Sequence, residues 1–327
     1  MNGKTAMEDP WRKWILVGVC GVLAGGGVAT IIHHKPDPPP AYQARVYVST
    51  EGARMPYRLY VPPNYDTRQK YPLVIWLHGS DAIGTDNLKQ ITGYNDAGTR
   101  VWTVHWKDFP TLVVAPQSYE RYWSLLPSPL PPEEPLVTEI VAALQKEFRI
   151  DSDRIYLAGQ SMGGFGVWAF LQRRPDSYAA AIVLCGPVPT GMISEAPAIA
   201  HIPVWVFHGA KDDVVPVTNA RSVVELLRKA GGRPRYTEYP DLGHFIGPAA
   251  FAESGLLPWL FAQKRKRSTI SLDPVRQSFQ SLLAEVRDQW STFASRMTRD
   301  SEVSQLASLL KCLMVRTIAV EESVTGD

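Results

Sequence analysis

The chain has 327 residues, of which 45% are hydrophobic and 20% charged, and this composition is ordinary for a globular protein with a sizeable core. Its formal net charge of +2 gives no indication of a nucleic-acid partner. The three cysteines, Cys20, Cys185 and Cys312, lie far apart without metal-ligand spacing, so neither a zinc site nor a disulfide framework is expected, and a single Cys185–Cys312 disulfide is the less favoured alternative.

The first predicted element is an uncharged run, Trp14–Ile32, that follows Arg12 and Lys13. As a helix of about 19 residues it would extend roughly 28 Å, which is close to the thickness of the bilayer hydrocarbon. We expect residues 1–32 to be a signal anchor, and a signal peptide cleaved near Gly27–Ala29 is the close alternative. The positive charges before the run predict a cytoplasmic N-terminus. The rest of the chain is then exported, either anchored and facing the periplasm or cell exterior, or secreted after cleavage.

A proline-rich spacer at 33–44 precedes a predicted catalytic domain at 45–263. The domain begins with two alternating segments, Arg45–Ser49 and Tyr57–Val61, which are typical of an edge hairpin. Uncharged apolar runs, which predict strands, then alternate with helical patterns, and this order predicts an α/β fold with a mostly parallel sheet covered by helices on both faces. The predicted strands are Leu73–Leu77, Leu112–Ala115, Ile155–Ala158, Ala180–Leu184, Val204–Phe207 and Arg235–Tyr239, and the predicted helices are Leu136–Phe148, Met162–Gln172 and Val217–Lys229.

Residues 264–327 form a predicted basic hinge and helical tail. The run Lys264-Arg265-Lys266-Arg267 opens it, and apolar residues from Val275 to Met297 then follow the spacing of an amphipathic helix. A shorter stretch of the same kind runs from Val303 to Leu313. We expect these helices to pack on the domain or on each other, and self-association through them is the alternative.

The strongest chemical signal is Gly159-Gln160-Ser161-Met162-Gly163, which matches G-x-S-x-G. It follows an apolar strand and opens a helix, the context in which this motif places a serine on a strained turn. A serine hydroxyl needs a base to take its proton before it can attack a carbonyl. We therefore predict Ser161 as the nucleophile of a serine hydrolase.

The other two members of the predicted triad follow later strands. His244 comes directly after the last strand and is the predicted general base, whereas His78 and His208, which precede glycines, are given structural roles. An acid must orient the base and stabilise its imidazolium form. Asp212 follows the preceding strand and is the predicted acid, with Asp213 in reserve.

Backbone N–H groups are expected to stabilise the oxyanion formed during attack. Ser80, after the first parallel strand, and Met162, after the nucleophile, are the predicted donors, and Asp81 and Asp86 are interpreted as loop caps. The aromatic side chains between positions 94 and 123 are assigned by default to the core, and Trp123 is the best candidate for a wall of the substrate pocket. No metal or cofactor is expected.

Three stretches carry a resemblance to a known family: Tyr71–Gly79, Arg154–Gly164 and His208–Pro216. Together they resemble the phospholipase/carboxylesterase and dienelactone-hydrolase-like branch of the α/β hydrolases, which includes feruloyl-esterase-like and "predicted peptidase" members. The resemblance covers residues 45–262 and implies an α/β-hydrolase fold and a cofactor-free acyl hydrolase with the triad named above. The short connection between the strands at 180–184 and 204–207 indicates that a large cap domain is absent.

One stretch departs from the family pattern and bears on selectivity. Related sequences often carry Gly-Glu-Arg-Gly soon after the early His-Gly, whereas this chain has Asp81-Ala82-Ile83-Gly84. The expected substrate is a small-molecule carboxylic ester. A serine peptidase of the same fold is the first alternative, because it would use the same triad. A non-catalytic, membrane-tethered scaffold is the second, and the complete set of triad residues argues against it.

Overall fold

The computed structural model describes residues 41–119, 123, 133–188 and 192–265. The chain divides into two units after Arg267, and every described residue belongs to the first unit. The predicted span Trp14–Ile32, most of the proline-rich spacer and the helices predicted beyond Val275 lie outside the described residues. Within the described residues, no helix is long and apolar enough to cross a membrane. The predicted domain limits at 45 and 263 therefore stay predictions.

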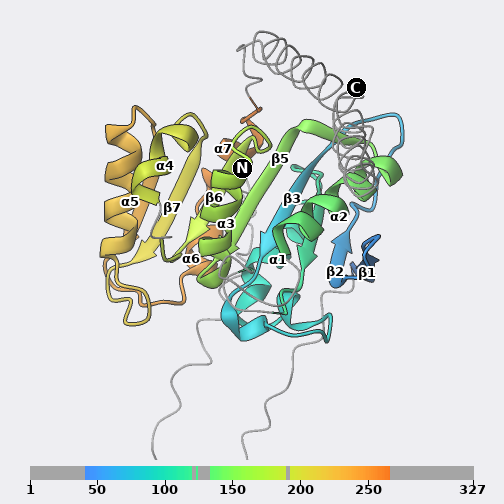
Figure 1. The fold of residues 1–327 in the computed structure, drawn as a ribbon, viewed down its shortest axis with the longest axis horizontal. Helices are drawn as coiled ribbons and strands as arrows, with labels where there is room; N and C mark the ends of the chain where they lie inside the picture. Colours follow the sequence, from blue (N-terminus) through green and yellow to red (C-terminus); the bar gives the residue numbers. More distant parts are fainter. Residues whose placement is uncertain (1–40, 120–122, 124–132, 189–191, 266–327) are drawn as a thin grey trace, which may run out of the picture. The chain divides into compact units, whose positions relative to one another are not determined.

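Eight strands form one sheet in the order β1-β2-β4-β3-β5-β6-β7-β8 (Figure 1). An antiparallel hairpin of β1 (Tyr42–Val48) and β2 (Arg54–Tyr60) lies at one edge, and β2 also runs antiparallel to β4 (Leu112–Pro116). From β4 to the other edge, all pairs are parallel. The other parallel strands are β3 (Tyr71–Leu77), β5 (Ile150–Gln160), β6 (Ala180–Leu184), β7 (Val204–Gly209) and β8 (Arg235–Tyr239). The predicted edge hairpin and mostly parallel sheet are confirmed.

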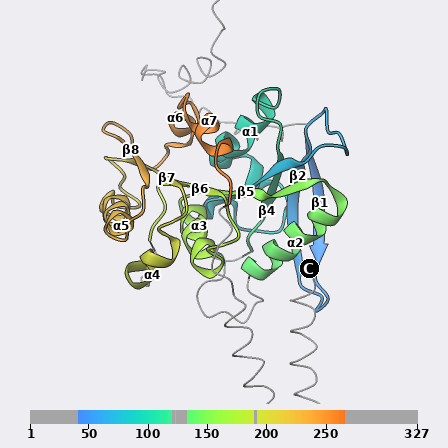
Figure 2. The same cartoon turned by 90° about the horizontal axis from the view of Figure 1, so that it is seen from above.

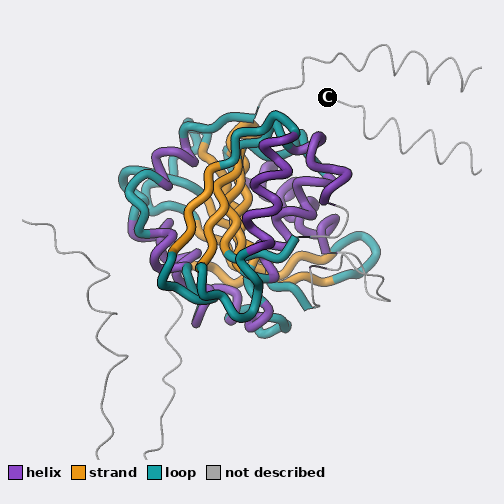
Figure 3. The backbone as a smooth tube through the Cα atoms, turned by 90° about the vertical axis from the view of Figure 1, so that its left-hand side faces the viewer, coloured by secondary structure: helices purple, strands orange, loops and turns teal. Residues whose placement is uncertain are grey.

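Helices cover both faces of this sheet (Figures 2 and 3). One layer contains α2 (Glu133–Glu147), α3 (Met162–Arg173), α4 (Met192–Ile199) and α5 (Thr218–Lys229). The opposite layer contains α1 (Asp96–Val104), α6 (Gly247–Phe251) and α7 (Leu256–Phe261). Three short 3₁₀ helices, η2 (Ser80–Ala82), η3 (Lys89–Ile91) and η4 (Gly93–Asn95), lie in the connection between β3 and α1. The connection between β6 and β7, where a cap would be inserted, holds the eight-residue α4.

Strand β3 shows why the buried parts of the central strands are apolar. All seven of its residues are buried. Leu73, Ile75 and Leu77 contribute to the core on the α2 and α3 side, whereas Val74 and Trp76 contribute to the core on the α1 and α6 side. Because side chains alternate between the faces of a strand, a strand covered on both faces is apolar at every position.

The helices that sequence patterns missed are short and interrupted. Pro248 and Pro258 lie inside α6 and α7, and Gly98 lies within α1, where a Cβ would collide with the Trp76 ring. Glycine and proline read as loop signals in a sequence, since both disfavour a helix interior. Here burial against the sheet outweighs that low helix propensity.

The parallel arrangement also determines where a site forms. The carboxyl ends of parallel strands meet at one edge of the sheet, and the loops that leave them come together there. Ser161 follows β5, Cys185 follows β6, Asp212 follows β7 by a short turn, and His244 follows β8. The fold therefore collects residues from distant parts of the chain at a single edge.

Candidate active site

Ser161 occupies a strained turn between β5 and α3. Its backbone has φ 55° and ψ −118°, a conformation that is costly for any residue except glycine. Its N–H donates a 2.8 Å hydrogen bond to the carbonyl of Leu184 in β6, which fixes the turn against the sheet. The residue is half-buried.

The two glycines of the motif are needed because backbones approach closely around this turn. A Cβ at Gly163 would overlap the carbonyl of Leu77, and a Cβ at Gly159 would overlap the carbonyl of Gly163. The first turn of α3 therefore sits directly on the ends of β3 and β5. This is the local reason for the G-x-S-x-G spacing in this chain.

The three residues of the predicted triad form one continuous hydrogen-bonded chain. The Ser161 Oγ lies 2.8 Å from His244 Nε2, and His244 Nδ1 lies 2.8 Å from Asp212 Oδ2. An ionised carboxylate only accepts hydrogen bonds, so Nδ1 carries the proton and donates it to Asp212. Nε2 is then free to accept the hydrogen bond of the Ser161 hydroxyl.

The Asp212 carboxylate is fully buried and bonded at both oxygens. Its Oδ1 accepts the backbone N–H groups of Val214 at 2.9 Å and Val215 at 2.8 Å. Its Oδ2 accepts His244 and lies 3.1 Å from Nε2 of His208. Asp213, the reserve candidate, is exposed. The structure thus brings Asp212 to the base and turns Asp213 toward solvent.

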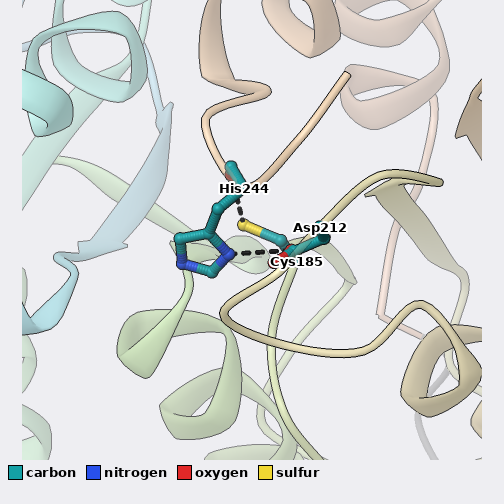
Figure 4. A group of neighbouring side chains, drawn as sticks. All are labelled: Cys185, Asp212 and His244. Carbon is teal, nitrogen blue, oxygen red and sulfur yellow. Dashed lines mark hydrogen bonds and ion pairs between the residues drawn. The ribbon is translucent and has the colours of Figure 1, made fainter. Parts of the chain in front are cut away.

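Two buried residues near the base were not assigned to the site from the sequence. His208, four residues before Asp212, places Nε2 within 2.9 Å of the Val215 carbonyl as well as near the Asp212 carboxylate. The Cys185 thiol donates a hydrogen bond to the backbone carbonyl of His244, with 3.2 Å between sulfur and oxygen (Figure 4). No sequence pattern pointed to either contact, because both depend on how the loops after β6, β7 and β8 pack together.

The chemistry of Cys185 is that of a buried thiol. Burial raises the pKa of this thiol far above its usual value, so the group stays protonated. Cys185, Asp212 and His244 could each offer an atom to a metal ion, and these atoms lie within 4.8 Å of one another. A cation there would have to displace the bond between Asp212 and His244, so this cluster fits the triad better than a metal centre.

The two predicted oxyanion donors are each the first residue of a helix. Met162 begins α3 and Ser80 begins η2, so neither N–H has an acceptor within its own helix. The position that a Cβ of Gly79 would occupy is 3.8 Å from the Cβ of Ser161, which shows how closely the loop after β3 approaches the serine.

His78 and Asn95 hold this loop in place. His78 is fully buried, its Nδ1 lies 2.6 Å from the Gly79 carbonyl, and its Nε2 accepts the Ser118 N–H at 2.8 Å. Burial lowers the pKa of His78 to about 4, so the ring is neutral and Nδ1–H donates to Gly79. The Asn95 side chain accepts the N–H of Gly79 at 3.0 Å. The structural role predicted for His78 is thus a contact that holds the loop after β3.

Trp123 requires a correction. Its side chain is fully buried, with ring centroids 5.0 Å from His78 and 6.3 Å from Phe170. A Cβ at Gly166 in α3 would collide with the Trp123 ring, so the indole fills the space that this glycine leaves. The ring therefore belongs to the core, which was the default expectation for the aromatic residues of this segment, and does not form an exposed wall of the site.

Several known proteins similar to this chain are esterases. The family model described as "Putative esterase" matches residues 49–224. A solved structure of a thermostable esterase is 37% identical with a TM-score of 0.62, and the match covers 69% of this chain and 63% of that one. Carboxylesterase SOBER1 of Arabidopsis thaliana is 25% identical over 189 residues, which are 53% of this chain and 83% of that protein. The bifunctional acetylxylan esterase/xylanase XynS20E of Neocallimastix patriciarum is 26% identical over 175 residues, and the match spans 23% of that protein's length.

Proposed function

The chain belongs to the esterase family that its residues 49–224 match, and from this premise we propose that it cleaves carboxylic esters through an acyl-enzyme formed on Ser161. It is a hydrolase with the α/β-hydrolase fold. The observation that carries the proposal is the continuous chain from Ser161 Oγ through His244 to Asp212, with 2.8 Å at each step. Such a chain lets one group take the serine proton while another stabilises the charge that results.

In the first half of the reaction, the Ser161 Oγ attacks the ester carbonyl carbon and its proton passes to His244 Nε2. The carbonyl oxygen becomes an oxyanion, which the N–H groups of Ser80 and Met162 stabilise. Asp212 stabilises the imidazolium of His244. When the intermediate collapses, the bond to the alkoxy oxygen breaks and His244 gives its proton to the departing alcohol.

In the second half, water attacks the acyl carbon and His244 takes a proton from that water. The new oxyanion uses the same two N–H groups. Collapse breaks the bond to Ser161, returns the proton to its Oγ and releases the carboxylic acid. His208 and the N–H groups of Val214 and Val215 keep the Asp212 carboxylate fixed through both halves.

The direct test is Ser161→Ala. This variant should fold but lose turnover of short p-nitrophenyl esters, because the attacking hydroxyl is gone. A fluorophosphonate probe should label the wild type and leave the variant unlabelled. Full ester turnover by the variant would refute the assignment of the nucleophile.

The same assay separates an esterase from a peptidase. Aminoacyl p-nitroanilides should be cleaved much more slowly than the esters, since an amide requires more leaving-group activation than an ester. Faster cleavage of the anilides would favour the peptidase alternative and would leave the triad in place.

The location of the enzyme is a separate proposal. The uncharged run Trp14–Ile32, with positive residues before it, supports export of the catalytic domain and its retention at the membrane by residues 1–32. Secretion after cleavage near Gly27–Ala29 is the alternative. Self-association through the helices predicted in 264–327 stays a prediction.

A further inference from the structure

Asp81 lies beside the nucleophile, in the stretch where the chain departs from the pattern of related sequences. The position of a Cβ on Gly79 is 2.9 Å from Asp81 Oδ1 and 3.8 Å from the Cβ of Ser161. The carboxylate therefore lies against Gly79, in the loop that approaches the serine. It does not cap a helix, unlike Asp86, whose Oδ1 accepts the N–H groups of Leu88 and Lys89.

The partners of Asp81 hold its carboxylate at this place by hydrogen bonds, without a direct ion pair. Both oxygens accept the Asn95 side-chain amide, at 3.2 and 3.1 Å, and no cation forms an ion pair with Asp81 among the described residues. Its burial raises the pKa of the carboxyl, whereas the hydrogen bond from Asn95 and the charges of His244 and Lys89 lower it.

Two exposed aromatic rings belong to residues that adjoin, along the chain, the Asn95 that binds Asp81 and the His244 base. Tyr94 directly precedes Asn95, and Phe245 directly follows His244. Their ring centroids are 4.9 Å apart in an edge-to-face arrangement, and the residues are 59% and 45% exposed. Most large apolar side chains of the domain are buried, so an accessible aromatic pair next to the base offers a surface for a ligand.

We propose that Asp81, Tyr94 and Phe245 form a subsite that binds a cationic group in the alcohol part of the ester. An unpaired carboxylate next to aromatic rings is the combination that recognises ammonium groups, through charge attraction and cation–π contacts. The alcohol side is favoured because His244 protonates the departing alcohol and Phe245 is attached directly to it along the chain. The same carboxylate disfavours esters with a negative charge at this position.

This inference rests on the proposed esterase activity, and the test compares two esters of nearly equal shape. Butyrylcholine carries a quaternary ammonium group, and 3,3-dimethylbutyl butyrate carries a neutral tert-butyl group in its place. The kcat/KM ratio of the cationic over the neutral ester should be roughly tenfold in the wild type, since the subsite is open to solvent and such contacts are individually modest. A ratio near one would overturn the subsite.

Three variants test which side chains produce the preference for the cationic ester. Asp81→Asn and Phe245→Leu should each lower the ratio by a factor of about three or more, the first through charge and the second through the ring face. Asp241→Asn is the matched control, because this exposed carboxylate lies three residues before His244 and is paired with Lys211 at 2.8 Å. It should leave the ratio unchanged. An equal loss in Asp241→Asn would show a general field effect and would overturn the role of Asp81.

A measurement without turnover separates this proposal from the esterase proposal. Choline should protect Ser161 of the wild type from the fluorophosphonate probe at lower concentrations than 3,3-dimethylbutan-1-ol does. Equal protection by the two alcohols would overturn the subsite. Labelling of Ser161 by the probe would still support its assignment as the nucleophile. If the probe does not label the protein and neither ester is cleaved, the esterase proposal fails. In that case, preferential binding of choline over 3,3-dimethylbutan-1-ol in ligand-observed NMR would still support the subsite.

Discussion

Among single residues, the neighbours Asp212 and Asp213 are distinguished by burial and hydrogen bonding. Asp212 is enclosed and accepts two backbone N–H groups in addition to His244, whereas Asp213 is exposed. Asp212→Asn removes the charge that stabilises the imidazolium and favours the wrong tautomer of His244. We expect kcat for a p-nitrophenyl ester to fall by about a thousandfold or more. Asp213→Asn should change kcat by less than about threefold, which is the scale of an exposed charge.

Steady-state kinetics of both variants against one ester tests this assignment. In the wild type, the rate should also fall as the pH decreases, because a protonated His244 cannot accept the Ser161 proton. A large loss in Asp213→Asn together with a small loss in Asp212→Asn would reverse the choice of acid.

A second residue-level prediction concerns His78 and stability. Burial lowers its pKa from 6.5 to about 4, so the unfolded chain binds a proton more readily than the folded chain between these values. The stabilising effect of the neutral ring is present above pH 6.5 and is lost as the pH falls toward 4, with a limit of about 3 kcal/mol. His78→Asn should be less stable than the wild type at pH 7.5, because the Ser118 N–H loses its acceptor. It should then lose less of its remaining stability between pH 7.5 and 5.

Urea unfolding at the two pH values measures this difference. His201→Asn is the control, since it makes the same replacement at an exposed histidine. If His78→Asn and the wild type lose the same free energy of unfolding between the two pH values, His78 is not the group responsible.

Among the elements, the contact of α3 with the ends of β3 and β5 is the tightest part of the site. Gly163→Ala places a methyl group against the carbonyl of Leu77, which is backbone and cannot rotate away. We expect a loss of at least about 2 kcal/mol in the free energy of unfolding. Ester turnover should fall as well, because α3 carries both the Met162 N–H and the Ser161 turn.

Gly255→Ala is the matched control for this prediction. Its Cβ would lie 3.8 Å from the Trp205 ring, an ordinary contact, and the φ of −86° at Gly255 suits alanine. Denaturant midpoints of the two variants should therefore differ clearly. Similar midpoints would mean that the close approach at Gly163 relaxes without cost.

For the whole molecule, the prediction concerns which part of the chain is sufficient for activity. All the residues assigned to the reaction lie between Ser80 and His244, and the described fold runs from Ala41 to Arg265. A chain of residues 41–267 should hydrolyse p-nitrophenyl esters with a kcat close to that of the full chain, because the sheet that positions the triad is complete.

Cell fractionation tests the role of the N-terminal run. The full chain should stay with the membranes after a carbonate wash, and the chain starting at 41 should be soluble. Recovery of a soluble mature protein that begins near Thr30 would instead show cleavage of a signal peptide.

The sequence by itself determined the features that depend on residues close together in the chain. The apolar runs at β3, β5, β6 and β7 predicted buried parallel strands, because a strand covered on both faces must be apolar throughout. The G-x-S-x-G motif identified the Ser161 turn, since only glycine fits where Gly159 and Gly163 meet neighbouring backbone. The chain order of the triad followed from the order of the strands.

The tertiary structure alone decided which side chains meet across long stretches of chain. Ser161 and His244 are 83 residues apart, and their bond exists only because β5 and β8 end at the same edge of the sheet. Burial of Trp123, the contact of Cys185 with His244, and the pairing of the Tyr94 and Phe245 rings depend on loop packing in the same way. Periodicity and local motifs carry no information on such contacts, because it is the packing of the loops against one another that brings these side chains together.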